Sequence, residues 1–195
     1  MKIKHAHILT REVLPFLASL LALVAIALLF DAFLHLLNAV WIGRYLGIPG
    51  VLLIVGSFGY SLRKRKLIQA GKPADLLRLH ERMAWAGSLL VLVHAGIHFN
   101  AILAWLAVWA MLINVGSGLT GKFLLQRSRR RLEEAREAMQ QQGLSRAELE
   151  DSTYWDTLTF DLVKQWRAVH FPIAFAFGVL AMAHILAVFW HWGWR

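Results

Sequence analysis

Cysteine is absent from the 195-residue sequence, and charged residues are few. Without cysteine the protein can form no disulfide, no thiolate-ligated iron–sulfur cluster and no covalent haem attachment through a C-x-x-C-H motif. Asp, Glu, Lys and Arg make up only 17% of the residues, whereas 58% are hydrophobic. A composition this apolar excludes a soluble globular domain.

Acidic residues are scarcer than basic ones, with 12 Asp and Glu against 21 Lys and Arg and a net charge of +9. In a soluble protein such a basic balance would favour nucleic-acid binding. Here the basic residues cluster in connections beside apolar segments, and membrane topology explains that pattern better. We therefore expect membrane lipid, and not nucleic acid, as a partner.

Long apolar runs are the main feature that is present. Runs of about 20 apolar residues can cross the hydrocarbon core of a bilayer, where only helices or closed barrels survive. The runs are continuous rather than alternating, so they predict an all-α integral-membrane helical bundle. Five spans are expected, the first retained rather than cleaved, at about 13–37, 45–62, 76–98, 100–124 and 168–190.

One long polar connection separates the fourth and fifth spans. Its sequence RSRRRLEEAREAMQQQG predicts a helix that ends at Gly143, and Ser145 with Glu148 could form a capping box for a second short helix. We expect a single membrane domain in three parts: spans one to four in 1–125, a cytoplasmic polar helical loop in 126–167, and the fifth span in 168–195.

The distribution of positive charge predicts the orientation of the spans. With a cytoplasmic N-terminus, all of the 21 Lys and Arg residues except Arg44 and Arg195 fall on the cytoplasmic side. Cytoplasmic connections of membrane proteins carry such an excess of Lys and Arg. We expect a multi-pass protein of the cell (inner) membrane with its C-terminus on the extracytoplasmic side.

Two of the predicted spans carry histidines at the same interval. His80 and His94 lie fourteen residues apart in the third span, and His170 and His184 do so in the fifth. Fourteen residues of helix rise about 21 Å and miss four whole turns by only about 40°, so both histidines of a span share one face. The third and fifth spans run in the same direction in this topology, which places His80 level with His170 and His94 level with His184.

Each level pair of imidazoles can clamp one haem iron from opposite sides. We therefore predict two b haems with bis-histidine ligation, an inner one on His80 and His170 and an outer one on His94 and His184. Ionisable groups at membrane depth are rare and costly, so they are functional-site hypotheses by default. The alternatives are hydrogen bonding between helices and a proton path.

Residues around the histidines suit a haem. Small residues let a flat macrocycle approach a helix backbone, and they share the histidine faces at Ala84, Gly87, Ala174, Gly178 and Ala181. Basic residues that could neutralise haem propionates cluster at the inner end, at Arg78, Arg82, Lys164 and Arg167. Aromatic residues that could line the haem edges are Phe171, Phe175 and Phe177.

Other polar residues of the spans have open roles. His98 and His191 lie beyond the outer ligands by about 6 and 10 Å along the helix axis, which is too little for another macrocycle. They are candidates for a propionate contact or an outer substrate site. Asp31 and His35 in the first span could bind a quinone or carry protons, or could be packed polar residues that face the bundle interior.

Three stretches resemble the ferric reductase-like transmembrane domain, the haem core shared by ferric reductases and NADPH oxidases. They are LHERMAWAGSLLVLVHAGIHF (79–99), VGSGLTGKFL (115–124) and WRAVHFPIAFAFGVLAMAHILAVF (166–189), and the resemblance covers about residues 45–190. The same histidine interval occurs in the di-haem cytochrome b of respiratory quinol-oxidising complexes. The resemblance implies that His80 with His170 holds an inner haem and that His94 with His184 holds an outer one.

Those reductases carry a flavin and nicotinamide module after the last span, and we expect none here. No G-x-G-x-x-G follows a strand, so the expected electron donor is a separate redox subunit or a membrane quinol.

The leading expectation is a di-haem b-type cytochrome that carries electrons across the membrane as a subunit of a respiratory oxidoreductase. Its expected partner is a soluble or extracytoplasmic electron carrier, with a quinone as a further candidate cofactor. Two alternatives stay open: a quinol-driven reductase of ferric iron or an oxygen species, and a haem-free membrane anchor or assembly factor.

Overall fold

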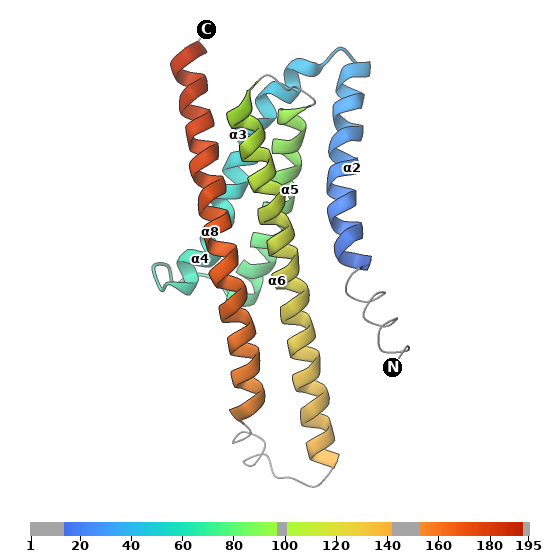
Figure 1. Ribbon diagram of the computed structural model, residues 1–195, viewed down its shortest axis with the longest axis vertical. Coiled ribbons are helices and arrows are strands. Elements are labelled where there is room, and N and C mark those ends of the chain that lie inside the picture. Colours follow the sequence, from blue (N-terminus) through green and yellow to red (C-terminus); the bar gives the residue numbers. More distant parts are fainter. Residues whose placement is uncertain (1–13, 97–100, 142–152, 193–195) are drawn as a thin grey trace.

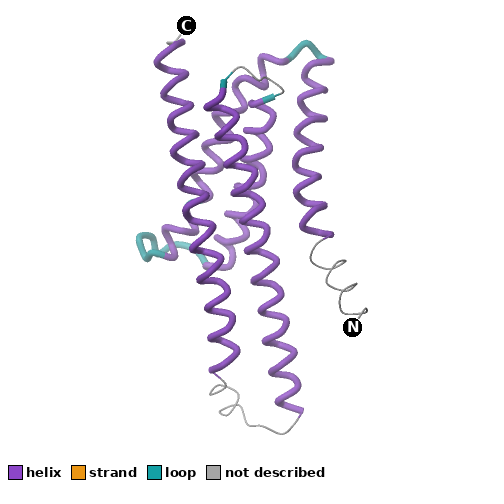
Figure 2. Tube along the Cα trace, in the orientation of Figure 1, coloured by secondary structure: helices purple, strands orange, loops and turns teal. Residues whose placement is uncertain are grey.

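All the secondary structure that the computed structural model describes is helical (Figures 1 and 2). The described residues are 14–96, 101–141 and 153–192, with side chains at 14–96, 101–123 and 164–191. The helices are α2 (Leu14–Leu36), α3 (Val40–Ser57), α4 (Gly59–Lys64), α5 (Pro73–Ala95), α6 (Ile102–Gln141) and α8 (Thr153–Trp192). The predicted all-α class is confirmed for this part of the chain, in which no residue forms a strand.

Four helical stretches are long and apolar enough to cross a membrane: Leu14–Leu36, Val40–Lys64, Ile102–Phe123 and Lys164–His191. Large apolar side chains point outward from them, and Leu36, Ile102 and Trp190 are 85%, 83% and 88% exposed. Exposure of apolar surface to water costs about 25 cal/mol per Å², a cost that lipid removes. These helices are those of a multi-pass membrane protein in contact with lipid.

The third predicted span, 76–98, differs from the other four. Its helix α5 is not among the stretches apolar enough to cross a membrane, because Asp75, Arg78, Glu81 and Arg82 lie in its first half. Its neighbours α2, α3, α4 and α6 all contact it. A helix that other helices cover can carry polar side chains that a lipid-facing helix cannot. The structure therefore shows four apolar spans and one more polar helix among them.

The helices alternate in direction through the bundle. Helices α2, α5 and α8 run upward in Figure 1, whereas α3 and α6 run downward. We call the end of the bundle that holds the last turns of α2, α5 and α8 the upper end, and the opposite end the lower end. Helices α5 and α8 are thus parallel, which is the arrangement that two level histidine pairs require.

Helices α6 and α8 extend well beyond their apolar stretches. Helix α6 continues to Gln141, through the polar sequence that follows Leu125, and α8 begins at Thr153, ahead of the polar residues Asp156, Asp161 and Lys164. The polar connection predicted as a separate loop, 126–167, is therefore mostly a continuation of these two spans. Elongating an existing helix is far easier than nucleating a new one. The predicted stop at Gly143 and the capping box at 145–148 lie outside the described residues.

Two closely packed helix pairs form the body of the bundle, α3 with α5 and α6 with α8. Gly50 and Gly87 let α3 and α5 approach, since a Cβ added at Gly87 would lie 2.8 Å from the Gly50 carbonyl oxygen. Gly121 does the same for α6 and α8, because an added Cβ would overlap the Trp166 ring. Helices α5 and α8 make little backbone contact with each other, so side chains bridge the space between them.

Candidate functional site

At the upper level, the imidazole of His94 on α5 faces that of His184 on α8. The two ring centroids are 6.5 Å apart, and the ring planes are inclined by 63°. A metal–imidazole bond is about 2 Å long, so two rings that bind one metal from opposite sides have centroids about 6 Å apart. The observed separation also fits an edge-on ring contact, so the surroundings of the rings must decide between the two.

Helix α3 orients the His94 ring. Nδ1 of His94 lies 3.4 Å from the carbonyl oxygen of Gly43, to which a protonated Nδ1 donates. Gly47 provides the space for the ring, because a Cβ added there would lie 2.8 Å from Cδ2 of His94. With Nδ1 directed at a carbonyl, the other ring nitrogen, Nε2, is the one left to bind a metal, as in most histidine-ligated sites.

The same helix orients His80 at the lower level. Nδ1 of His80 donates to the carbonyl oxygen of Ser57, at 2.9 Å, and the Tyr60 ring lies beside the imidazole with a centroid distance of 6.1 Å. His80 is partly buried between the helices. The arrangement of His94 is therefore repeated one level down, on the same pair of helices.

Helix α6 orients the imidazole of His170 on α8. Nδ1 of His170 lies 3.1 Å from Oγ of Ser117. The Trp166 ring stacks on the imidazole at 4.9 Å and 21°, and Nε1 of Trp166 donates to the Ser117 carbonyl oxygen at 2.8 Å. His170 lies within electrostatic range of His80, as His184 does of His94. The structure thus brings the rings of the upper pair, His94 and His184, into contact, and it orients each ring of the lower pair from a helix other than its own.

The groups that orient the imidazoles were not identified from the sequence. Ser57 and Ser117 act through a carbonyl and a hydroxyl, and neither residue type predicts such a role by itself. The glycines of α3 did carry a signal, because Gly43, Gly47 and Gly50 follow one another at intervals of four and three residues. Small residues at that spacing mark a helix face that another helix approaches closely.

The two glycines predicted to lie against a haem have different settings. Gly87 is buried against α3, where it faces Gly50 and Ile54, so its lack of a side chain serves the contact between α3 and α5. That setting corrects the expectation that Gly87 faces a macrocycle. Gly178 on α8 is exposed, and a Cβ added there would meet no atom within 4 Å.

The phenylalanines of α8 also divide into two kinds. Phe171 and Phe175 are 48% and 74% exposed, as lipid-facing residues are, whereas Phe177 is only 8% exposed. Phe177 lies midway in sequence between His170 and His184, and seven residues of helix are close to two turns. Phe177 is therefore the aromatic residue that shares the histidine face of α8.

The four basic residues predicted to contact haem propionates have different settings. Arg78 is exposed and pairs with Asp75 on its own helix, and Arg82 and Lys164 are exposed as well. Arg167 differs, because its Nε is buried and has no hydrogen-bond partner among the described residues. A buried donor without an acceptor costs about 1–3 kcal/mol. Arg167 precedes His170 by one turn, so an anionic group at the lower level would satisfy it.

The remaining predicted candidates lie apart from the two histidine pairs. His191 is exposed, and its Nδ1 bonds to the Ala187 carbonyl oxygen of its own helix at 3.0 Å. His98 lies outside the described residues. Asp31 is buried in α2, and Nδ1 of His35 bonds to the Asp31 carbonyl oxygen at 2.9 Å.

A metal centre built from three or more protein ligands is not found in the described part of the chain. No group of three or more His, Cys, Asp or Glu side chains there could hold a metal ion. Structural zinc sites take four such ligands and catalytic ones three. A pair of imidazoles suits instead a metal whose other ligands come from a macrocycle, as in a haem with two axial histidines.

Comparison with known proteins gives no match for this chain. No protein-family model matches it. A search of the curated proteins and a search of the solved structures each return no match. The likeness to the ferric reductase-like domain therefore stays a prediction, and function is argued below from the geometry of the site.

Proposed function

We propose that this protein is an integral-membrane di-haem b-type cytochrome that carries electrons between the two faces of a membrane. The observation that carries the proposal is the 6.5 Å separation of the His94 and His184 ring centroids, on two parallel helices whose backbones make little contact. The second pair, His80 and His170, is related to the first by the same interval on both helices. Two sites at two depths are what electron transfer across a bilayer requires.

The residues present fit a b haem. A bound haem supplies one-electron chemistry at its iron. His80, His94 and His170 each direct Nδ1 at an oxygen of a neighbouring helix, which fixes the ring and leaves Nε2 for the metal. Such partners hold the ring orientation and raise the basicity of the ligand. Two imidazoles per iron leave no open position, so outer-sphere electron transfer is favoured over oxygen binding.

Positive charge at the lower level suits the carboxylates that a b haem carries. The unpartnered Nε of Arg167 lies one turn from His170, and Lys64 lies within electrostatic range of Arg167. A charge-assisted hydrogen bond to a carboxylate is about twice as strong as a neutral one. Arg167 is thus the residue in the described part best suited to hold a propionate.

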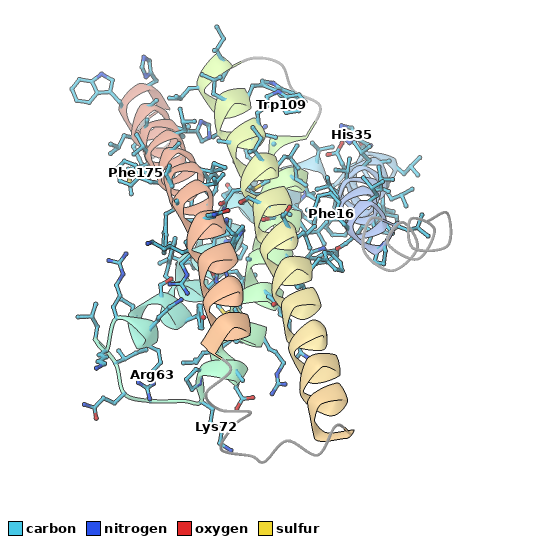
Figure 3. The ribbon with its side chains drawn as sticks, turned by 60° about the horizontal axis from the view of Figure 1, so that its bottom comes forward. Phe16, His35, Arg63, Lys72, Trp109 and Phe175 are labelled. Carbon is cyan, nitrogen blue, oxygen red and sulfur yellow. The ribbon has the colours of Figure 1, made fainter. Side chains whose placement is uncertain are left out.

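The bundle is oriented by its basic end. Among the described side chains, Lys and Arg gather at the lower end, where Figure 3 shows Arg63 and Lys72, and Arg44 is the exception at the upper end. By the positive-inside rule the lower end faces the cytoplasm. The lower site then exchanges electrons with a partner on the cytoplasmic side, and the upper site with a membrane or extracytoplasmic partner.

Haem stoichiometry tests the proposal. A pyridine haemochrome assay on the purified protein should give two b haems per chain, and His94→Ala or His184→Ala should each remove one while sparing the other. His191→Ala is the matched control, since His191 bonds only to its own helix and should retain both haems. A purified chain with no b-type absorbance in the reduced state would exclude the function.

A further inference from the structure

A cavity of about 300 Å³ lies between α2, α5 and α6, outside the space that the histidine pairs occupy. Its walls are apolar or aromatic, with Leu28, Leu92, Trp105 and Trp109 among them, and Asp31 is its one carboxylate. Pockets for small organic molecules have volumes of about 300–1,000 Å³ and this same mixture of apolar wall and few polar groups. The cavity is therefore large enough for one aromatic ring with short substituents.

Asp31 decides what kind of molecule can enter. It is only 8% exposed and stands in an apolar wall at membrane depth, where a carboxylate is costly unless it is paired. Its carboxylate oxygen lies 3.6 Å from Nδ1 of His35, whose side chain is 50% exposed near the upper end. A carboxylate repels anions and accepts hydrogen bonds, so this cavity favours an occupant with a hydrogen-bond donor on an apolar body.

The cavity shares a wall with the upper histidine pair. Leu92 and Ala95 of α5 line it, and they flank His94, whose ring faces α3 and α8 on the other side of the same helix. Only the thickness of one helix separates the two, about 10–12 Å with side chains. A redox-active occupant would thus lie next to the upper site.

We propose that this cavity binds the head group of a membrane quinol, with Asp31 accepting a hydrogen bond and then a proton from a ring hydroxyl. The inference rests on the proposed function, because the electrons need acceptors. Oxidation of one quinol to quinone releases two electrons and two protons. Two bound ferric haems would supply the acceptors for these electrons, one each, and both protons would pass in turn to Asp31 and through His35 to the water at the upper end.

Binding can be tested with a readout that does not depend on haem reduction. Decylubiquinone is added to the purified protein, and the quenching of tryptophan fluorescence is followed. Trp105 and Trp109 line the cavity, so wild-type protein should show a saturable quenching component. Ala27→Phe, which fills the cavity from α2, should remove that component. Ala25→Phe on the exposed side of α2 is the matched control and should retain it. Quenching that does not saturate, or that Ala27→Phe leaves unchanged, would overturn the site.

Electron delivery is tested by stopped-flow reduction of the purified cytochrome with decylubiquinol. Asp31→Asn should lower the rate of haem reduction at least tenfold, while dithionite reduces the same haems as fast as in wild-type protein. A wild-type rate with decylubiquinol in Asp31→Asn would overturn the role of Asp31. Saturable quenching in a purified chain that contains no haem would instead support the cavity and exclude the di-haem function. A failure of the quinol site can therefore be distinguished from a failure of the proposed function.

Discussion

Three of the four paired imidazoles are held through Nδ1 by a helix other than their own. His80 and His94 bond to carbonyl oxygens of α3, and His170 bonds to a hydroxyl of α6. Each ring is therefore positioned by tertiary packing and not by its own helix. A histidine that only filled space between helices would not need the same nitrogen directed outward at each position, and this repetition favours the ligand interpretation.

Loss of the Ser117 hydroxyl should weaken the lower site. In Ser117→Ala, His170 keeps its stacking on Trp166 but loses its partner at Nδ1. Removal of such a partner typically costs about 10- to 100-fold in metal affinity, so one of the two haems should dissociate that much more readily. Haem transfer to apomyoglobin, followed by absorbance, measures the release.

Thr120→Ala is the control for that experiment. Thr120 lies on the same helix, is exposed and bonds only to the Gly116 carbonyl oxygen of its own helix, at 2.9 Å. Its removal should leave haem release unchanged. Equal release rates for Ser117→Ala and the wild type would show that Ser117 does not hold a haem ligand.

At this scale the sequence predicted the histidine pairs and misjudged some of their neighbours. The pairs follow from helical periodicity, which fixes the face that His80 and His94 share. Periodicity does not say what stands opposite that face. Gly87 has the correct phase, yet α3 covers it, and Arg78, which we predicted to contact a propionate, pairs with Asp75 on its own helix.

Among the helices, α5 has the most polar sequence of the predicted spans and the most helix neighbours. The many helix neighbours permit the polar sequence, because protein contacts replace lipid around α5. Lys122 of α6 pairs with Glu81 of α5 at 2.8 Å, which compensates one of its charges. A helix of this kind carries the functional side chains while the apolar helices around it face the bilayer.

Close contact between α3 and α5 should be sensitive to a single methyl group. In Gly87→Ala the new Cβ would lie 2.8 Å from the Gly50 carbonyl oxygen, which is backbone and cannot move aside cheaply. Overpacking of this kind costs about 1–3 kcal/mol, so we expect a lower midpoint of thermal unfolding in detergent, followed by tryptophan fluorescence.

The matched substitution is Gly59→Ala in α4, where an added Cβ meets no atom within 4 Å. Its unfolding midpoint should equal that of the wild type. If Gly87→Ala were equally stable, the approach of α3 to α5 at Gly50 would be wider than described, and the support of α3 for His80 and His94 would be in doubt.

For the whole molecule, the uneven distribution of charge is the property that orients it. The absence of cysteine makes orientation easy to measure, because every introduced thiol is the only one in the chain. In intact cells, Leu37→Cys between α2 and α3 should react with a membrane-impermeant maleimide. Gln69→Cys between α4 and α5 should react only after the cells are lysed.

Both positions are exposed in the structure, so burial does not explain a difference between them. The reverse labelling pattern would place the lower end outside the cytoplasm and exchange the cytoplasmic and extracytoplasmic ends of the proposed electron path. Labelling of both positions in intact cells would contradict a membrane-spanning bundle.

The sequence by itself determined that the chain is helical and membrane-embedded, and that each of two spans carries two histidines on one face. Hydrophobic length and helical period are local properties, readable within about 25 residues. Only the tertiary structure decided that the ring centroids of His94 and His184 lie 6.5 Å apart, that Gly87 faces α3, and that Asp31 lines a cavity. In lipid, apolar surface does not select one helix neighbour over another, so small residues and hydrogen bonds between distant segments make that choice.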